Sequence, residues 1–400
     1  MEPPQILRFV LQMPAKMTDI KTAKIEPVSG FTYPKHGGDP RAVAELLGTN
    51  SDTLIDFSAS INPLSPPGCV AQLLLETPRI LREYPDPDCS IVTQKIAQAT
   101  QIPEDWIRVT NGSTELIYLL PHLLAKEQEV AIIDPCFSEY KKSFVAGGFS
   151  PHSIALSADQ DFQAEPALIF PKLDRIQQLG ALIIGNPASP TGKLYKTFMP
   201  LLQAYCESRN IILIIDETFI EFSSAENSAW NLLQRNSNLI LIRSLTKFYS
   251  IPGLRIGYGV LHPEQIEKIS PHQYPWSVNA LAQAIGAEVV LDRSFQEKTR
   301  DAIRHERGFM FKALNAIREI EVFSSDANFL LFRLRDYSPP LDRALYQYLI
   351  SRSLLLRNCG NFCGLDDSFF RISLRERCEN QKLVDSISGF FASRQRDMKK

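Results

Sequence analysis

Short runs of apolar, mostly β-branched residues recur through the middle of the chain, separated by stretches long enough to form helices. Four of these runs lie at 130–134, 181–185, 211–216 and 239–243. Each run is apolar at consecutive positions rather than at alternate ones, which indicates a strand that is buried on both faces. Such strands alternating with helices are typical of a mainly parallel sheet, so the pattern predicts an α/β fold.

Beyond about residue 275 the pattern changes. It predicts one long helical segment from Ala280 to about Leu314, a further helix near 341–353, and strands at 328–333 and 369–375. This mixture is typical of a smaller α+β domain. The predicted organisation is a mobile N-terminal extension (1–30), an arm that belongs partly to the small domain (31–70), a large domain (71–275) and a small C-terminal domain (276–400).

Composition and charge exclude several classes of partner. The 43 basic and 45 acidic side chains give a formal charge of −2, and no run of lysine and arginine is long enough to follow a nucleic-acid backbone. No apolar stretch approaches the roughly 20 residues needed to span a bilayer, and the N-terminus has no signal-peptide pattern. We therefore expect neither nucleic acid nor a membrane as a partner, and we predict a cytoplasmic location.

The cysteines are scattered and odd in number, without a C-x-x-C pair, so we interpret them as reduced thiols. They are Cys69, Cys89, Cys136, Cys206, Cys359, Cys363 and Cys378. The last three, which lie closest together, would be the alternative candidates for a metal site. No histidine lies near them, so no metal is expected.

Polar residues follow three of the predicted strands. The strand ending at residue 185 leads into Asn186-Pro-Ala-Ser-Pro-Thr-Gly192, the next into Asp216-Glu-Thr-Phe219, and the last into Ser244, Thr246 and Lys247. Ligands of such sheets bind at the carboxyl ends of the strands. Each signal alone is weak, because an aspartate after a strand is commonly a turn former and a lysine in a loop is commonly solvated. Their ordered combination predicts one shared site.

The chemistry of the combination indicates pyridoxal 5′-phosphate. Lys247 can form an imine, and Arg255, eight positions later, can contact a phosphate. Gly112 and Ser113 lie at an expected helix start, where free N–H groups favour a phosphate, although such a start is more often only a cap.

The ring of this cofactor would need partners of its own. A carboxylate such as Asp216 would keep the pyridine nitrogen protonated, and Asn186 could donate to the phenolic oxygen. Phe137 either stacks on the ring or packs in the core.

These segments resemble the fold-type-I pyridoxal-phosphate enzymes, the aspartate aminotransferase superfamily, over nearly all of the chain after about residue 31. The resemblance rests on N-x-x-x-P-T-G, D-E-x-[FY] and S-x-[ST]-K-x-x-x-x-x-G-x-R in family order, at Asn186, Asp216 and Ser244. It implies a large domain with a mainly parallel seven-stranded sheet and a smaller α+β domain. It also implies that Lys247 is the Schiff-base lysine, Asp216 the pyridinium partner and Asn186 the donor to the phenolic oxygen. It assigns the phosphate cup to Gly112, Ser113, Ser244, Thr246 and Arg255.

The resemblance also implies a homodimer with shared active sites. Tyr84 is similar to the tyrosine that reaches the cofactor phosphate of the neighbouring subunit. Phe219 departs from the tyrosine that many aminotransferases have, so one hydrogen bond to the cofactor oxygen is missing.

Two further stretches resemble the threonine-phosphate decarboxylases of cobalamin biosynthesis, with the histidinol-phosphate aminotransferases as near relatives. They are His36-Gly-Gly-Asp39 with 55–67, and 356–364 with 370–375. By family position Arg371 would hold the α-carboxylate, and Arg357 and His36 the phosphate of a small phosphorylated amino acid. Asn62 is counted with these substrate-binding residues. Arg375 is interpreted as a solvated surface charge.

Two other functions stay open at this stage. One is a pyridoxal-phosphate-dependent aminotransferase of the histidinol-phosphate type. The other is a ligand-sensing protein without catalysis, against which the lysine, the aspartate and the arginine of the motifs argue, as does the lack of a DNA-binding segment.

Overall fold

The computed structural model describes residues 33–34, 37–47, 50–233 and 238–397. The predicted mobile extension, residues 1–30, lies outside the described residues, and so does His36. Within the described part, no helix combines the length and the apolar character that crossing a bilayer requires.

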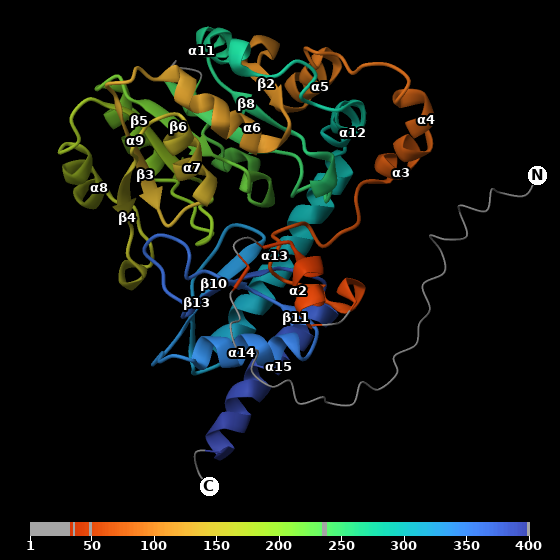
Figure 1. The fold of residues 1–400 in the computed structure, drawn as a ribbon, viewed down its shortest axis with the longest axis vertical. Coiled ribbons are helices and arrows are strands. Elements are labelled where there is room, and N and C mark those ends of the chain that lie inside the picture. Colours follow the sequence, from red (N-terminus) through yellow and green to blue (C-terminus); the bar gives the residue numbers. More distant parts are fainter. Residues whose placement is uncertain (1–32, 35–36, 48–49, 234–237, 398–400) are drawn as a thin grey trace, which may run out of the picture. The chain divides into compact units, whose positions relative to one another are not determined.

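A seven-stranded sheet forms the centre of the larger part of the fold (Figure 1). Its strands, in spatial order, are β2 (Ile107–Thr110), β8 (Gly257–Val260), β7 (Leu239–Ser244), β6 (Ile212–Asp216), β5 (Leu179–Gly185), β3 (Glu129–Asp134) and β4 (His152–Ala155). Neighbours from β7 to β4 run parallel, and β8 is antiparallel to both β7 and β2. The predicted mainly parallel α/β sheet is confirmed.

Both faces of this sheet are buried, as the continuous apolar runs predict. On one face, Ile132, Ile214 and Ile242 join Leu116 and Phe144 of two covering helices in one core. The alternate positions, such as Leu182, Leu213 and Leu241, point to the other face and are also buried. Because β3, β5, β6 and β7 run parallel, their carboxyl ends meet at one edge of the sheet, where the chain leaves the core.

The helices around the sheet are mostly short. They are α3 (Gly68–Leu75), α4 (Thr77–Ile80), α5 (Ser90–Thr100), α6 (Gly112–Leu119), α7 (Ser138–Ala146), α8 (Pro166–Leu173), α9 (Phe198–Glu207), α10 (Trp230–Leu233) and α11 (Pro263–Ile269). Leu116 in the core belongs to α6 and Phe144 to α7, so these two helices cover the same face.

A second, antiparallel sheet has the order β12 (Arg357–Asn358), β13 (Phe369–Ser373), β10 (Phe329–Leu334) and β9 (Ile320–Val322). A two-stranded parallel pair, β1 (Ile55–Asp56) with β11 (Leu354–Leu355), lies beside it. Helices α2 (Pro40–Leu47), α14 (Leu341–Ile350) and α15 (Arg377–Asp397) complete this part. The predicted α+β mixture is confirmed by these elements.

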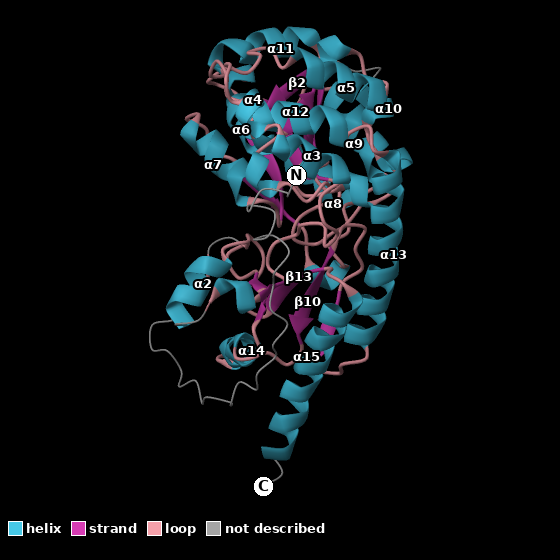
Figure 2. Cartoon of the chain, turned by 90° about the vertical axis from the view of Figure 1, so that its right-hand side faces the viewer, coloured by secondary structure: helices cyan, strands magenta, loops and turns pink. Residues whose placement is uncertain are grey.

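The single long helix predicted from Ala280 to about Leu314 is wrong in one respect. The chain forms two helices, α12 (Ala280–Val289) and α13 (Arg293–Asn315). The break has a local cause, because the side chain of Asp292 accepts a hydrogen bond from the N–H of Phe295 and starts a new helix there. Figure 2 shows α13 running beside the four-stranded sheet.

Contacts group the chain from Tyr33 onward into one compact unit. The boundaries expected at 70/71 and 275/276 therefore stay predictions. The pairing of β1 with β11 ties the segment before residue 70 to the C-terminal part.

Candidate active site

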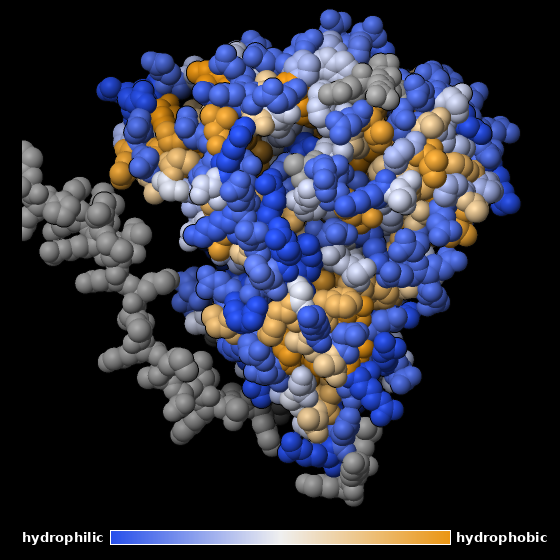
Figure 3. All heavy atoms as spheres, turned by 180° about the vertical axis from the view of Figure 1, so that it is seen from behind, coloured by the Kyte–Doolittle hydropathy of each residue, from blue (hydrophilic) through white to orange (hydrophobic). Residues whose placement is uncertain are grey.

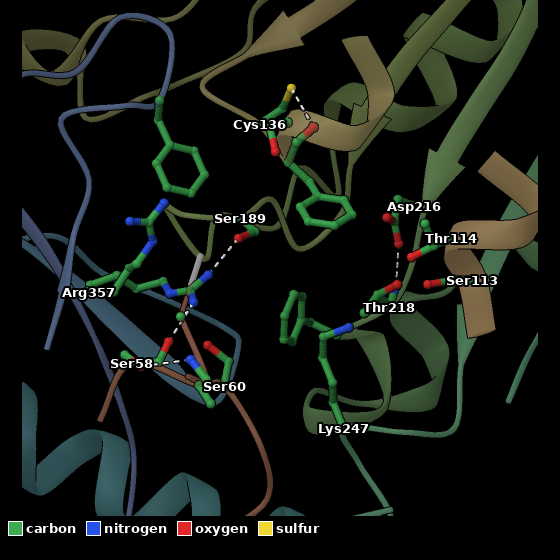
Figure 4. Close-up of a pocket in the computed structure, with 18 of the residues that line it drawn as sticks. Ser58, Ser60, Ser113, Thr114, Cys136, Ser189, Asp216, Thr218, Lys247 and Arg357 are labelled. Carbon is green, nitrogen blue, oxygen red and sulfur yellow. Dashed lines mark hydrogen bonds between the residues drawn. The ribbon is translucent and has the colours of Figure 1, made fainter. Parts of the chain in front are cut away.

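A cavity of about 850 Å³ lies between the carboxyl edge of the seven-stranded sheet and strands β12 and β13 of the smaller sheet. Figure 4 shows the side chains that point into it. One side carries Lys247, Asp216 and Arg255, and the other carries Arg357 and Arg371. Five residues that the sequence places far apart thus line one cavity.

Lys247 follows the end of β7 by three residues. Its carbonyl accepts a hydrogen bond of 3.0 Å from the backbone N–H of Asn62. The side-chain amide of Asn62 donates to the carbonyl of Phe248 at 2.7 Å and to Thr299 at 3.0 Å. Asn62 therefore fixes the backbone that presents the lysine.

The environment of Lys247 lowers the pKa of its amine to about 8. Burial is the largest cause, and the positive charges of Arg255 and Arg371 act in the same direction. The negative charge of Asp216 opposes them. A lysine with this pKa is partly in its neutral, nucleophilic form near neutral pH.

Asp216 is the last residue of β6 and is 6% exposed. One carboxylate oxygen accepts a hydrogen bond of 2.6 Å from the hydroxyl of Tyr140, and the other accepts one of 2.8 Å from the N–H of Thr218. Burial, followed by the charge of Asp216, raises the pKa of Tyr140 well above its usual range. The tyrosine stays protonated and orients the carboxylate.

A cradle for a phosphate lies at the start of α6. Gly112 has a φ of +72°, and a Cβ on it would stand 2.5 Å from the guanidinium of Arg255. Ser113, Thr246 and Arg255 line the cavity around this point. Ser244 is behind them, because its hydroxyl bonds that of Thr246 at 2.8 Å. The glycine leaves the room that the arginine needs beside free backbone N–H groups.

The loop after β5 holds Asn186 and Ser189. This residue is 1% exposed, and its side-chain oxygen accepts a hydrogen bond of 2.8 Å from the N–H of Tyr195. It is not among the residues that line the cavity, whereas Ser189, three positions later, is. The hydroxyl of Ser189 accepts a bond of 3.0 Å from Arg371 and still has its own proton to donate. The bond from Tyr195 occupies the oxygen of the Asn186 side chain and leaves its amide nitrogen to donate, so the role of Asn186 stays a prediction and Ser189 is a further polar group at the cavity.

The aromatic residues predicted near the cofactor, Phe137 and Tyr84, lie in different places. Phe137 lines the cavity directly before α7, with its ring edge to face on Tyr140 at 5.9 Å. Tyr84 is 84% exposed and packs on Trp276 with ring centroids 5.3 Å apart. It lies outside the cavity of its own chain. Phe219 lines the cavity, with the Lys247 amine 5.3 Å from its ring centre.

The opposite wall is built around two arginines. Arg357 of β12 and Arg371 of β13 are direct partners in the antiparallel register, so their side chains leave the same face of the sheet. Arg371 donates to Ser189 at 3.0 Å and to the carbonyl of Ser58 at 2.9 Å. Burial lowers its pKa to about 10. Like charges placed directly opposite repel. An anion between them removes that cost.

Arg357 is 5% exposed and is held by neighbours on both sides. It donates to the carbonyl of Pro34 at 2.7 Å and to the side-chain oxygen of Asn361 at 2.6 Å. Gly37 and Gly38 also line the cavity. A Cβ on Gly37 would stand 2.2 Å from the carbonyl of Ser58, so only glycine allows this approach.

Two residues weighed in the sequence lie elsewhere. Arg375 pairs with Glu379 at 2.9 Å and does not line the cavity. Of the cysteines considered for a metal, Cys359 is buried while Cys363 and Cys378 are exposed. Within the described residues, no group of three or more potential ligands could hold a metal ion.

Sequence reasoning missed Tyr140 and Ser189. Tyr140 lies in the first turn of α7, three positions after Phe137, the residue that precedes the helix. Ser189 lies inside a motif whose asparagine drew the assignment instead.

The fold and this site define the class of protein. A sequence profile of the family Aminotransferase class I and II matches residues 52–387, and the chain belongs to that family. Pyridoxal 5′-phosphate is its cofactor. The residues present fit this group, because the glycine cradle with Arg255 suits a phosphate and Asp216 suits a protonated ring nitrogen.

Particular relatives narrow the comparison. The chain is 35% identical to a threonine-phosphate decarboxylase of Salmonella typhimurium over 88% of this chain and 95% of that one. It is 25% identical to a histidinol-phosphate aminotransferase of Methanosphaera stadtmanae, over 88% and 94%. A solved histidinol-phosphate aminotransferase of Clostridium acetobutylicum has a TM-score of 0.77 at 32% identity, covering 84% and 98%.

Proposed function

We propose that the chain is a pyridoxal-phosphate-dependent lyase that decarboxylates L-threonine O-3-phosphate to (R)-1-amino-2-propanol O-2-phosphate in cobalamin biosynthesis. The observation that carries the proposal is the pair Arg357 and Arg371, in direct register on one sheet face of the cavity. A small substrate with a carboxylate and a phosphate supplies one anion for each guanidinium. The similarity to the Salmonella decarboxylase supports the same substrate.

The chain's own residues divide the work between the two walls. Arg371, with the hydroxyl of Ser189, holds the α-carboxylate, and Arg357 holds the phosphate together with the predicted contribution of His36. Asn62 contributes by fixing the backbone of Lys247. Two fixed anions set the rotation of the substrate about its Cα, and so decide which bond faces the cofactor.

On the other wall, the residues bind the cofactor and set the protonation of its ring. Gly112, Ser113, Ser244, Thr246 and Arg255 would hold its phosphate, Asn186 would donate to its phenolic oxygen, and Phe137 would pack against its ring. Asp216, oriented by Tyr140, keeps a proton at the ring nitrogen. When bound, the cofactor supplies an electron sink for the bond that breaks at Cα. Lys247, with a pKa of about 8, moves a proton at Cα after carbon dioxide has left.

The proposal includes a homodimer in the cytoplasm. Large apolar side chains are exposed around α3, α4 and the segments beside them, on the upper left edge in Figure 3. They are Leu74, Leu75, Leu81, Tyr84, Ile91, Tyr274 and Trp276. A second copy that covers this surface would bring its Tyr84 to the partner's cofactor phosphate.

A second candidate is an aminotransferase of the histidinol-phosphate type, favoured by the 32% identical solved structure. Histidinol phosphate carries a phosphate but no carboxylate, so it would leave Arg371 without an anion. Purified protein should be given threonine phosphate, and in parallel histidinol phosphate with 2-oxoglutarate. The proposal predicts carbon dioxide and an amine phosphate in the first mixture. Amino-group transfer without gas in either mixture would contradict it.

A further inference from the structure

Thr218 is a residue of the cavity to which neither the sequence motifs nor the proposed function assigns a role. It lies two positions after Asp216, is 6% exposed and lines the cavity. Its backbone N–H donates to the carboxylate of Asp216 at 2.8 Å. Glu217, which lies between them in the sequence, does not line the cavity and pairs with Arg243 at 2.7 Å. The segment after β6 therefore directs Asp216 and Thr218, but not Glu217, to the cavity.

The hydroxyl of Thr218 is buried and has no hydrogen-bond partner in the described part of the chain. A hydroxyl in this position costs free energy, because the water that it loses on folding is not replaced. Two other buried threonines near the phosphate cradle are paired. The hydroxyl of Thr110 donates to the carbonyl of Gly112 at 3.0 Å, and that of Thr246 bonds Ser244 at 2.8 Å. The unpaired hydroxyl of Thr218 therefore points to a partner that the protein itself does not supply.

The place of Thr218 in the cavity is that of the cofactor ring. Figure 4 shows its side chain between those of Asp216 and Lys247, the two residues assigned to the ring nitrogen and to the imine. The next residue, Phe219, has its ring centre 5.3 Å from the Lys247 amine. A threonine moves between staggered rotamers in which its hydroxyl and its methyl group exchange places. The hydroxyl can therefore turn toward an acceptor on the ring while the backbone stays fixed.

The phenolic oxygen is the acceptor on the ring that still has room for a donor. In the proposed function the ring nitrogen faces Asp216 and the phosphate lies at the cradle of Gly112, so the choice of this acceptor rests on that placement. One ring carbon separates the nitrogen from the carbon that carries the phenolic oxygen, so a side chain fixed beside Asp216 is close to both. Asn186 is one predicted donor to this oxygen. Phe219 has no hydroxyl with which to be a second.

We propose that Thr218 binds the cofactor, and that its hydroxyl donates a hydrogen bond to the phenolic oxygen. This bond replaces the one that Phe219 cannot make, and it gives the buried hydroxyl its partner. A donor to the phenolic oxygen draws electron density from it, so the oxygen holds less strongly the proton on the nitrogen that joins Lys247 to the cofactor. Thr218 thus both strengthens cofactor binding and lowers the pH at which that nitrogen loses its proton.

The test compares Thr218→Val, which keeps the shape and removes the hydroxyl, with Thr218→Ser, which keeps the hydroxyl. Each full chain is freed of cofactor and titrated with pyridoxal phosphate. We expect the dissociation constant to rise by roughly tenfold in Thr218→Val and to change by less than about twofold in Thr218→Ser. The pH at which the absorbance of the bound cofactor changes should rise by about one unit in Thr218→Val alone. Thr100→Val, which removes a hydroxyl that donates to the carbonyl of Ile96 at 2.7 Å outside the cavity, is the control and should change neither quantity.

The stability of the cofactor-free chains completes the test. Thr218→Val leaves no hydroxyl unpaired, so its thermal midpoint without cofactor should equal or exceed that of the unaltered chain. A lower midpoint would show that the hydroxyl has a partner inside the protein, and it overturns the proposal. An unchanged dissociation constant and absorbance in Thr218→Val also overturn it, and so does a Thr218→Ser chain that binds as weakly as Thr218→Val. None of these measurements uses threonine phosphate, so their outcome is separate from that of the decarboxylation assay.

Discussion

The two walls of the cavity are built by different kinds of structure. The wall with Lys247 and Asp216 is made of residues that directly follow buried parallel strands, so local sequence fixes where they lie. The wall with Arg357 and Arg371 depends on pairings between distant segments, including β1 with β11 and the approach of Gly37 to Ser58. The first wall suits a cofactor shared by a whole family. In the proposed function, the second sets the spacing of two anion sites.

The largest expected effect comes from the first wall. Lys247→Ala removes the amine that moves the proton, and we expect turnover to fall by about 10⁴-fold. Borohydride should fix the cofactor covalently to the unaltered chain and not to the variant. Absorbance and intact mass measure this directly. If Lys247→Ala keeps its turnover, Lys247 does not take part in the reaction, and the wall that carries it is not the reactive one.

A substitution on the second wall should weaken the contacts with the substrate and leave those with the cofactor unchanged. Arg371→Lys keeps the charge but loses the planar fork, and we expect kcat/KM for threonine phosphate to fall by roughly a hundredfold while cofactor affinity is unchanged. Steady-state kinetics and a cofactor titration separate the two. Arg375→Lys, at a residue paired with Glu379 outside the cavity, is the matched control. Similar losses in both variants would contradict the anchoring role.

Tyr140→Phe tests whether the reaction depends on the hydrogen bond that Tyr140 donates to Asp216. The variant loses a hydrogen bond of 2.6 Å to a charged group, so turnover should fall by about tenfold. Its pH profile should also shift, because Asp216 keeps only the hydrogen bond from the N–H of Thr218. Tyr118→Phe removes a comparable bond of 2.9 Å to Glu139 at the surface and should leave turnover unchanged. Equal pH profiles for Tyr140→Phe and the unaltered chain would assign Tyr140 to packing alone.

The smallest effect concerns stability without cofactor. Folding lowers the pKa of Lys247 from 10.5 to about 8. Between these values the unfolded chain holds a proton that the folded chain has lost, so the free energy of unfolding rises with pH across this window. Below about pH 8 both states are protonated, so the free energy of unfolding no longer changes with pH and the cost of burying the charged amine is fully present. Thermal midpoints of the cofactor-free chain, relative to Lys247→Met, should rise by on the order of a few degrees from pH 8 to 10.5. If the thermal midpoints of the two chains change with pH in parallel, the lowered pKa of Lys247 is contradicted.

The difference between the two walls also explains which parts of the site the sequence could predict. Lys247 and Asp216 could be placed in one site because strand ends of a parallel sheet share an edge. The break at Asp292 was missed because a helix cap inside a helical pattern leaves the periodicity almost unchanged. Ser189 could not be recognised as a cavity residue, since that depends on which way a loop residue points. The opposition of Arg357 and Arg371 depends on strand register, which periodicity alone does not fix.

The central claim is that two anchored anions turn the carboxylate, rather than the hydrogen, toward the cofactor. A single-turnover experiment with threonine phosphate labelled at its carboxyl carbon tests this most directly, with the holoenzyme in excess over substrate. The account predicts that the label leaves as carbon dioxide in an amount equal to the amine phosphate formed. Label retained in a 2-oxo acid phosphate, with the amino group left on the cofactor, would contradict it.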